Sequence, residues 1–127
     1  MADEFTVSGT LKIVKGFLED SKKVTNLSIT QDGDGAAGGV QNIGTAAEAI
    51  DMGDVGTAGM FWFRNLAASG GNFVQIGQDV SAGGFEEFLK LNPGEFALGR
   101  LDLATGGVLQ AKADTGAVEL QYIIYEA

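Results

Sequence analysis

The chain has 127 residues, a formal net charge of −9 and a pI of about 4.2, and it contains neither cysteine nor histidine. The missing cysteine excludes disulfides and thiolate metal sites, and the missing histidine removes the commonest general base. The acidic balance disfavours contact with phosphate backbones and anionic bilayers, so we expect neither nucleic acid nor a membrane as a partner.

The N-terminal segment predicts two strands. Residues 4–15 alternate between apolar and polar side chains, a pattern typical of a half-buried strand. Residues 16–23 are predicted to be a polar hairpin connection, and residues 24–30 a second strand. The first residues lack a basic region followed by an apolar stretch, so we expect no secretion signal.

The segment 31–58 is rich in glycine, alanine and aspartate, and it is predicted to be a long irregular loop. A short strand over 40–43 is compatible with its pattern. Thr45 and Glu48 have the spacing of a capping box, which predicts one helical turn. Because structureless loops of this length are usually functional, we expect an arm that becomes ordered against a neighbour.

The second half predicts a series of short strands separated by glycine-containing turns. The turns are expected at 69–72, 92–95 and 114–116, the last as a hairpin turn. The strands are expected at 60–63, 73–76, 85–91, 96–101, 108–113 and 118–125. This spacing predicts an all-β fold, a single antiparallel β-sandwich domain over 1–127 that is jelly-roll-like. A generic immunoglobulin-like sandwich is the alternative.

The motifs that resemble chemical sites lack their required context. Residues 33–38 match the letters of a dinucleotide-binding fingerprint, but the residues that follow have no helical pattern. Asp32 and Asp34 resemble the start of a calcium loop, yet position twelve is Ile43 rather than glutamate. A different cation site at these aspartates stays open. We predict no catalytic residue, no metal site and no cofactor, and we expect a protein that is not an enzyme.

The aromatic segment at residues 60–64 is the most specific candidate for a contact surface. In a strand, Phe61 and Phe63 share one face, while Met60, Trp62 and Arg64 share the other. Methionine, tryptophan and arginine are enriched in protein interfaces, and the same face could instead stack on a sugar ring. Burial of both faces is the structural alternative.

The C-terminal strand also has apolar side chains on both faces, which suits a central strand or a subunit contact. Tyr125 lies on this strand. The predicted interface residues are Met60, Trp62, Tyr125, Asp32 and Asp34.

Several segments together resemble the small virion proteins of tailed bacteriophages. They are Gln41-Asn42-Ile43-Gly44-Thr45-Ala46-Ala47-Glu48-Ala49-Ile50, Gly53-Asp54-Val55, Phe63-Arg64-Asn65-Leu66, Asn72-Phe73-Val74-Gln75-Ile76-Gly77, Leu91-Asn92-Pro93-Gly94-Glu95 and Ala111-Lys112-Ala113-Asp114-Thr115. The resemblance covers residue 40 to the end. It implies a β-sandwich or jelly roll that decorates a capsid or belongs to a tail or baseplate, and it transfers no active site.

We therefore expect a capsid decoration or cement protein, made in the host bacterial cytoplasm and located on the capsid surface of the virion. It would stabilise the head by binding between capsid subunits. Its expected partners are the major capsid protein and other copies of itself, as a dimer or trimer. The rivals are a tail or baseplate β-sandwich that binds host carbohydrate, and a carboxylate-dependent hydrolase.

Overall fold

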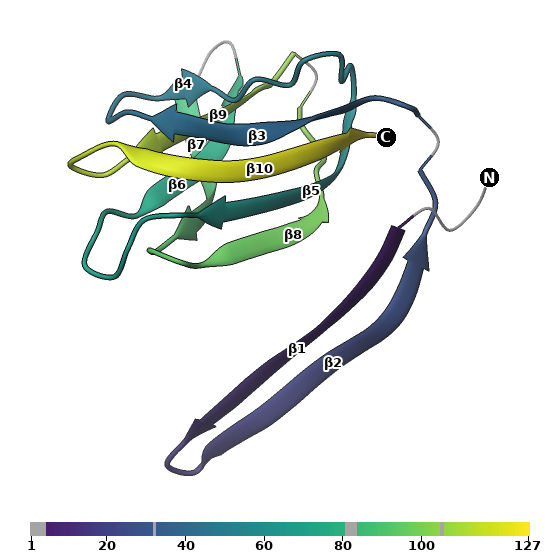
Figure 1. Ribbon diagram of the computed structural model, residues 1–127, viewed down its shortest axis with the longest axis vertical. Helices are drawn as coiled ribbons and strands as arrows, with labels where there is room; N and C mark the ends of the chain where they lie inside the picture. The colour runs from purple at the N-terminus through teal and green to yellow at the C-terminus, as the bar shows by residue number, and fades with distance from the viewer. Residues whose placement is uncertain (1–4, 32, 81–83, 105) are drawn as a thin grey trace. The chain divides into compact units, whose positions relative to one another are not determined.

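The computed structural model describes residues 5–31, 33–80, 84–104 and 106–127, and these residues form strands and no helix (Figure 1). The strands pair in antiparallel sheets, so the predicted all-β antiparallel fold is confirmed. The chain divides into two compact units, residues 1–32 and residues 33–127, which are described separately below.

The first unit is a two-stranded hairpin. Strand β1 (Phe5–Lys15) pairs antiparallel with β2 (Leu18–Ile29). The turn between them has Gly16 at φ 59°, a left-handed conformation that glycine adopts without steric cost. The register shifts once, where Asn26 has φ 52° and its backbone N–H donates to the Ser8 hydroxyl at 2.9 Å.

Two expectations for this segment were wrong. Residues 18–23, expected in the connection, belong to β2, because their polar side chains alternate within the ladder rather than form a loop. The expected half-burial is found only at Phe5 and Val7, since Leu11 is 76% and Ile13 is 42% exposed. Alternation identifies an apolar face, but only a second layer can bury it.

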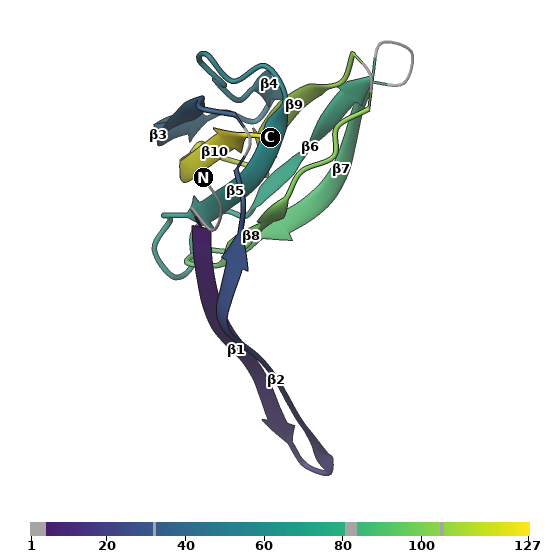
Figure 2. The same cartoon turned by 90° about the vertical axis from the view of Figure 1, so that its right-hand side faces the viewer.

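The second unit contains two four-stranded antiparallel sheets, which lie as two layers in Figure 2. The first sheet has the order β3 (Ala36–Ile43), β10 (Val118–Glu126), β5 (Ala58–Asn65) and β8 (Phe96–Arg100). The second has the order β4 (Glu48–Ala49), β9 (Val108–Ala113), β6 (Val74–Val80) and β7 (Gly84–Leu91).

The pairing of these strands is nested. The outermost pair along the chain is β3 with β10, followed inward by β4 with β9, β5 with β8, and β6 with β7. The predicted sandwich is thus present in residues 33–127, whereas it was expected over 1–127. The jelly-roll subclass stays a prediction, and nested pairing is the connectivity that it requires.

The core lies between the inner faces of the two sheets. Phe63, Ile76, Leu120 and Ile124 are fully buried there, with strands of both sheets contributing. A core of this kind is close-packed, so truncation of Phe63 to alanine is expected to cost about 3–5 kcal/mol.

Asn65 is the buried polar residue of the described chain, and its side chain is fully hydrogen-bonded. Its amide donates to the carbonyls of Asn72 and Leu91, each at 3.0 Å, and its Oδ1 accepts from the backbone N–H of Ala67 at 2.8 Å. One side chain therefore joins the end of β5 to the following loop and to the end of β7 in the opposite sheet.

The predicted loop over residues 31–58 was wrong, because it contains β3 and β4. The physical reason lies in Gly38, where an added Cβ would stand 2.7 Å from the Tyr122 carbonyl oxygen. Glycine at this position allows the backbone of β10 to approach closely, which is a known role of glycine inside strands. Composition alone instead assigns a glycine-rich segment to a loop.

Two other local predictions were also wrong. Thr45 and Glu48 start no helical turn; the Glu48 carboxylate instead accepts from the backbone N–H of Gly44 at 3.2 Å. Residues 114–116 connect strands of different sheets, so they are not a hairpin turn. The turn at 92–95 is confirmed, with the N–H of Glu95 donating to the Asn92 carbonyl and Gly94 at φ 82°.

Gly77 provides a direct stability test. It lies at the bulge of the β6–β7 ladder, and an added Cβ would overlap the carbonyl oxygen of Glu86. We expect Gly77→Ala to lower the free energy of unfolding by about 1–3 kcal/mol in urea titrations. Gly99→Ala is the matched control, because its Cβ would meet the Phe61 ring at an ordinary 3.5 Å. Equal losses in both variants would contradict this assignment.

Tyr122 predicts an alkaline dependence of stability. Its hydroxyl donates to the Asp51 carbonyl at 2.7 Å, and burial followed by the Asp51 charge raises its pKa above the ordinary 10.0. The folded chain then holds the phenolic proton more tightly than the unfolded chain. The free energy of unfolding therefore keeps this contribution below pH 10 and loses it as the pH rises further. Chemical unfolding at pH 8–11 should show this slope, and Tyr122→Phe should flatten it.

Candidate functional site

The two sheets of the sandwich differ in the side chains of their outer faces. On the sheet of β6 and β9, Gln75 lies opposite Lys90 and Lys112 in the register. The Lys90 ammonium lies 4.3 Å from the centroid of the Phe73 ring. This outer face is mainly polar and charged, and Val108 is an exposed apolar residue on it.

The outer face of the other sheet has an apolar centre, which the polar side chains of Arg64, Arg100 and Gln121 surround in the register. We define the aromatic face as Val40, Trp62, Phe96, Leu98 and Ile123, from all four strands of that sheet. Trp62 and Phe96 stack with ring centroids 4.9 Å apart and an interplanar angle of 18°. Leu98 and Ile123 are the direct neighbours of Trp62 on either side. The side chains therefore form one contiguous patch.

The Trp62 ring is held in a fixed orientation. Its indole N–H donates to the Gln121 side-chain oxygen at 3.1 Å, while its face is stacked on Phe96. The Arg64 guanidinium borders the patch and donates to the Gly94 carbonyl at 3.4 Å. The Trp62 side chain is thus already fixed by its polar atom and by its ring face. Contact with a partner would therefore cost it no further rotamer freedom.

An open hollow of about 400 Å³ lies beside Trp62. Its lining includes Gly39 and Val40 of β3 and Gln121 and Ile123 of β10. The glycines of β3 leave this part of the sheet without side chains, which is why the surface is hollowed next to the indole ring. The hollow thus combines an aromatic wall with one amide.

The predicted contact residues have different surroundings. Trp62 and Tyr125 are half-buried, and Met60 is only 7% exposed, so Met60 offers little area for contact. Asp34 is exposed, while Asp32 lies outside the described residues, so the structure does not test a cation site formed by both. Among the residues that are described, no group of three or more acidic side chains is placed to hold a metal ion.

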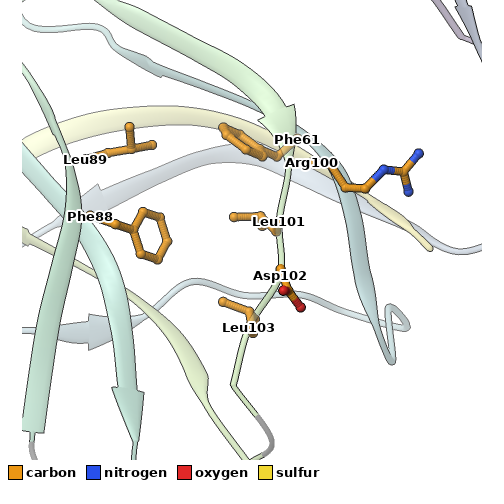
Figure 3. Close-up of a pocket in the computed structure, with 7 residues that line it drawn as sticks. All are labelled: Phe61, Phe88, Leu89, Arg100, Leu101, Asp102 and Leu103. Atoms are coloured by element: carbon orange, nitrogen blue, oxygen red, sulfur yellow. The ribbon is translucent and has the colours of Figure 1, made fainter.

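A second hollow of about 260 Å³ lies between β7 and β8, the edge strands of the two sheets. Figure 3 shows Phe61, Phe88, Leu89, Leu101 and Leu103 directed into it, with Arg100 and Asp102 directed away. Its lining is therefore apolar and its border is charged. We call it the edge pocket.

The edge pocket depends on the bulge in β7. Ile76 pairs with Leu89, but the next residue, Gly77, pairs with Glu87, so Phe88 has no partner across the ladder. An extra residue of this kind turns the strand and redirects side chains. Adjacent residues Phe88 and Leu89 consequently both line the pocket, which regular alternation forbids.

Sequence reasoning found Trp62 but missed Phe96 and Val40. The alternation of Phe96, Ala97 and Leu98 gave a usable signal, since it places two large apolar groups on one face. The edge pocket gave none, because a β-bulge has no reliable sequence signature.

No protein-family model, curated protein or solved structure matches this chain. Within the described ranges, no helix is long and apolar enough to cross a membrane.

The single tryptophan of the chain makes the aromatic face measurable. Phe96 is 55% exposed, so Phe96→Ala should cost only about 0.5–1.5 kcal/mol of stability, the value of an aromatic pair. Loss of the stacked ring admits water to Trp62, and the fluorescence maximum should move to longer wavelength. Val108→Ala, on the other sheet, should leave the spectrum unchanged. An unchanged spectrum in Phe96→Ala would contradict the stacking.

Proposed function

We propose that the protein is a structural component of a tailed-phage virion that attaches to the outside of the capsid between capsid subunits and reinforces the head. The aromatic face supplies the contact. The observation that supports this most is the Trp62–Phe96 stack on the outer face of a rigid sheet.

The exposure of the aromatic face supports a binding role. Val40 and Phe96 are each 55% exposed, and Leu98 is 40% exposed, while the opposite outer face is polar. Contiguous apolar patches on one side of a domain mark interaction sites. Tryptophan and arginine are also the residue types that most often dominate binding energy in an interface.

The charge of the sandwich is compatible with decoration of a symmetric particle. Residues 33–127 contain four basic and twelve acidic residues, a net charge of −8. Like charge disfavours nonspecific contact between sandwich surfaces of free copies. On a capsid lattice the same contact is repeated many times, so modest affinity at each copy gives high total occupancy when copies also contact one another.

The hollow beside Trp62 favours a second candidate, a tail or baseplate protein that binds host carbohydrate. A sugar ring stacks on an indole face, and the Gln121 amide next to it offers hydrogen bonds to hydroxyl groups. This candidate uses the same residues but predicts a small ligand rather than a broad protein contact.

Co-sedimentation with phage heads assembled without this protein tests the proposal. The wild-type chain should bind to saturation at a stoichiometry set by the capsid symmetry. Trp62→Ala should raise the dissociation constant by about 30-fold or more, the effect of removing an interface residue worth at least 2 kcal/mol. Val108→Ala, an exposed apolar truncation on the polar sheet, should bind as wild type.

The outcome also separates the two candidates. Wild-type protein that ignores heads but binds a glycan array through Trp62 would support carbohydrate binding and overturn capsid decoration. Head binding that survives Trp62→Ala unchanged would remove the aromatic face from the contact. Circular dichroism of each variant confirms that the fold is retained.

A further inference from the structure

The β1–β2 hairpin has one apolar face that nothing within its own two strands can cover. Residues directly opposite in an antiparallel pair lie on the same face, and the register places Leu11 opposite Lys22 and Lys15 opposite Leu18. The large apolar residues Leu11, Ile13, Leu18, Val24 and Leu27 share this face and are between 42% and 76% exposed. Thr10, Lys12 and Ser21 lie on the opposite, polar face.

The tip of the hairpin is the most exposed apolar point of the described chain. Phe17 follows Gly16 in the turn, and its side chain is fully exposed, at 110%. An isolated two-stranded sheet is marginally stable in water, and a fully exposed phenylalanine adds to its cost. Since β1 has 11 residues, the hairpin is about 35 Å long and its tip can reach another molecule.

Charge indicates the kind of surface that the hairpin fits. Residues 5–29 contain four lysines and two carboxylates, a net charge of +2 in a chain whose total is −9. Lys22 forms an ion pair with Asp20 at 2.9 Å, whereas Lys12, Lys15 and Lys23 have no ion-pair partner among the described residues. The complementary surface is therefore acidic, and the sandwich of the same sequence carries −8.

The edge pocket combines the two properties that the tip requires. Its interior is apolar, with Phe88 still 45% exposed at the opening, and its volume is about 260 Å³. Asp102 lies at its border, and Glu86 and Glu87 are exposed on β7 immediately before Phe88. Arg100 and Asp102 balance each other in the lining, so the acidic excess belongs to the sandwich as a whole.

We propose that the hairpin is an assembly arm and that Phe17 of one copy inserts into the edge pocket of a second copy. Lys15 then lies near Asp102, the acidic residue at the border of the pocket. The pocket receives an aromatic ring among Phe61, Phe88 and leucine side chains. The arm and the pocket are separate parts of one sequence, so every copy offers both.

A contact between unlike surfaces of identical chains is heterologous, and it closes into a ring when the rotation permits. The arm therefore gives the protein a means to join its own copies, whereas the aromatic face is proposed for the capsid. The two contacts share no residue, so either can fail without the other.

Cysteine pairing tests the arm directly, because the natural chain has no cysteine. Two differently tagged proteins, Phe17→Cys and Phe88→Cys, are mixed under mild oxidation, and disulfides are mapped by mass spectrometry. Insertion brings the two thiols within reach of a disulfide, which needs Cβ atoms about 3.5–4.5 Å apart. We expect the mixed disulfide to be the main product. Phe17→Cys mixed with Val108→Cys is the matched control and should give none.

A second measurement uses association without cross-linking. Phe17→Ser should weaken self-association in analytical ultracentrifugation at least tenfold, while Val14→Ser, also exposed on the hairpin at 64%, should change it less than threefold. Lys15→Glu and Asp102→Lys should each weaken association at low salt, and the double variant should recover it. Recovery reports a pairing of charges that a folding defect does not produce.

Three results would overturn the proposal. Wild-type protein that stays monomeric at the highest soluble concentration shows that no arm contact forms. Equal cross-linking of the Phe17→Cys protein to the Phe88→Cys and Val108→Cys proteins shows nonspecific collision. A disulfide confined to one chain in the double variant Phe17→Cys, Phe88→Cys shows that the pocket is filled from within the same molecule.

Discussion

The sandwich depends on strand β10, which hydrogen-bonds to β3 on one side and to β5 on the other. Because β3 begins the sandwich and β10 ends it, this pairing closes the nested set of strands. The inward side chains of β10, Leu120, Tyr122 and Ile124, are all in the core. Its outward side chains include Gln121 and Ile123, which support the aromatic face. One strand thus fixes both the interior and the proposed contact surface.

Close backbone approach is the condition under which this arrangement forms. Gly38 lies against β10 at a distance that leaves no space for a Cβ, and Gly77 lies against the carbonyl of Glu86 in the same way. The first glycine precedes Gly39, which lines the hollow beside Trp62, and the second accompanies the bulge that aims Phe88 into the edge pocket. Both surface features therefore originate in places where side chains are missing.

The proposed contacts divide between the two units of the chain. A sheet face has rigid rings and a broad area, which suits a large partner surface. A hairpin has length, an apolar face and opposite charge, which suits a neighbouring copy of an acidic domain. On the proposed particle, contacts of both kinds would add to occupancy.

The sequence alone determined the class of fold. Alternation, glycine turns and the absence of helical periodicity predicted antiparallel strands, and the pairs Phe61, Phe63 and Met60, Trp62 were correctly placed on opposite faces of one strand. These properties depend on local backbone geometry, which the order of residues specifies.

Tertiary structure alone decided what covers each face. The pattern of β1 predicted burial, yet Leu11 is exposed, since two strands cannot enclose a core. The glycine-rich residues 36–43 indicated a loop, yet pairing with β10 makes them a strand. The Trp62–Phe96 stack and the pocket at Phe88 join segments far apart in sequence. Their formation depends on register and on a bulge, which follow from long-range packing and have no local signal.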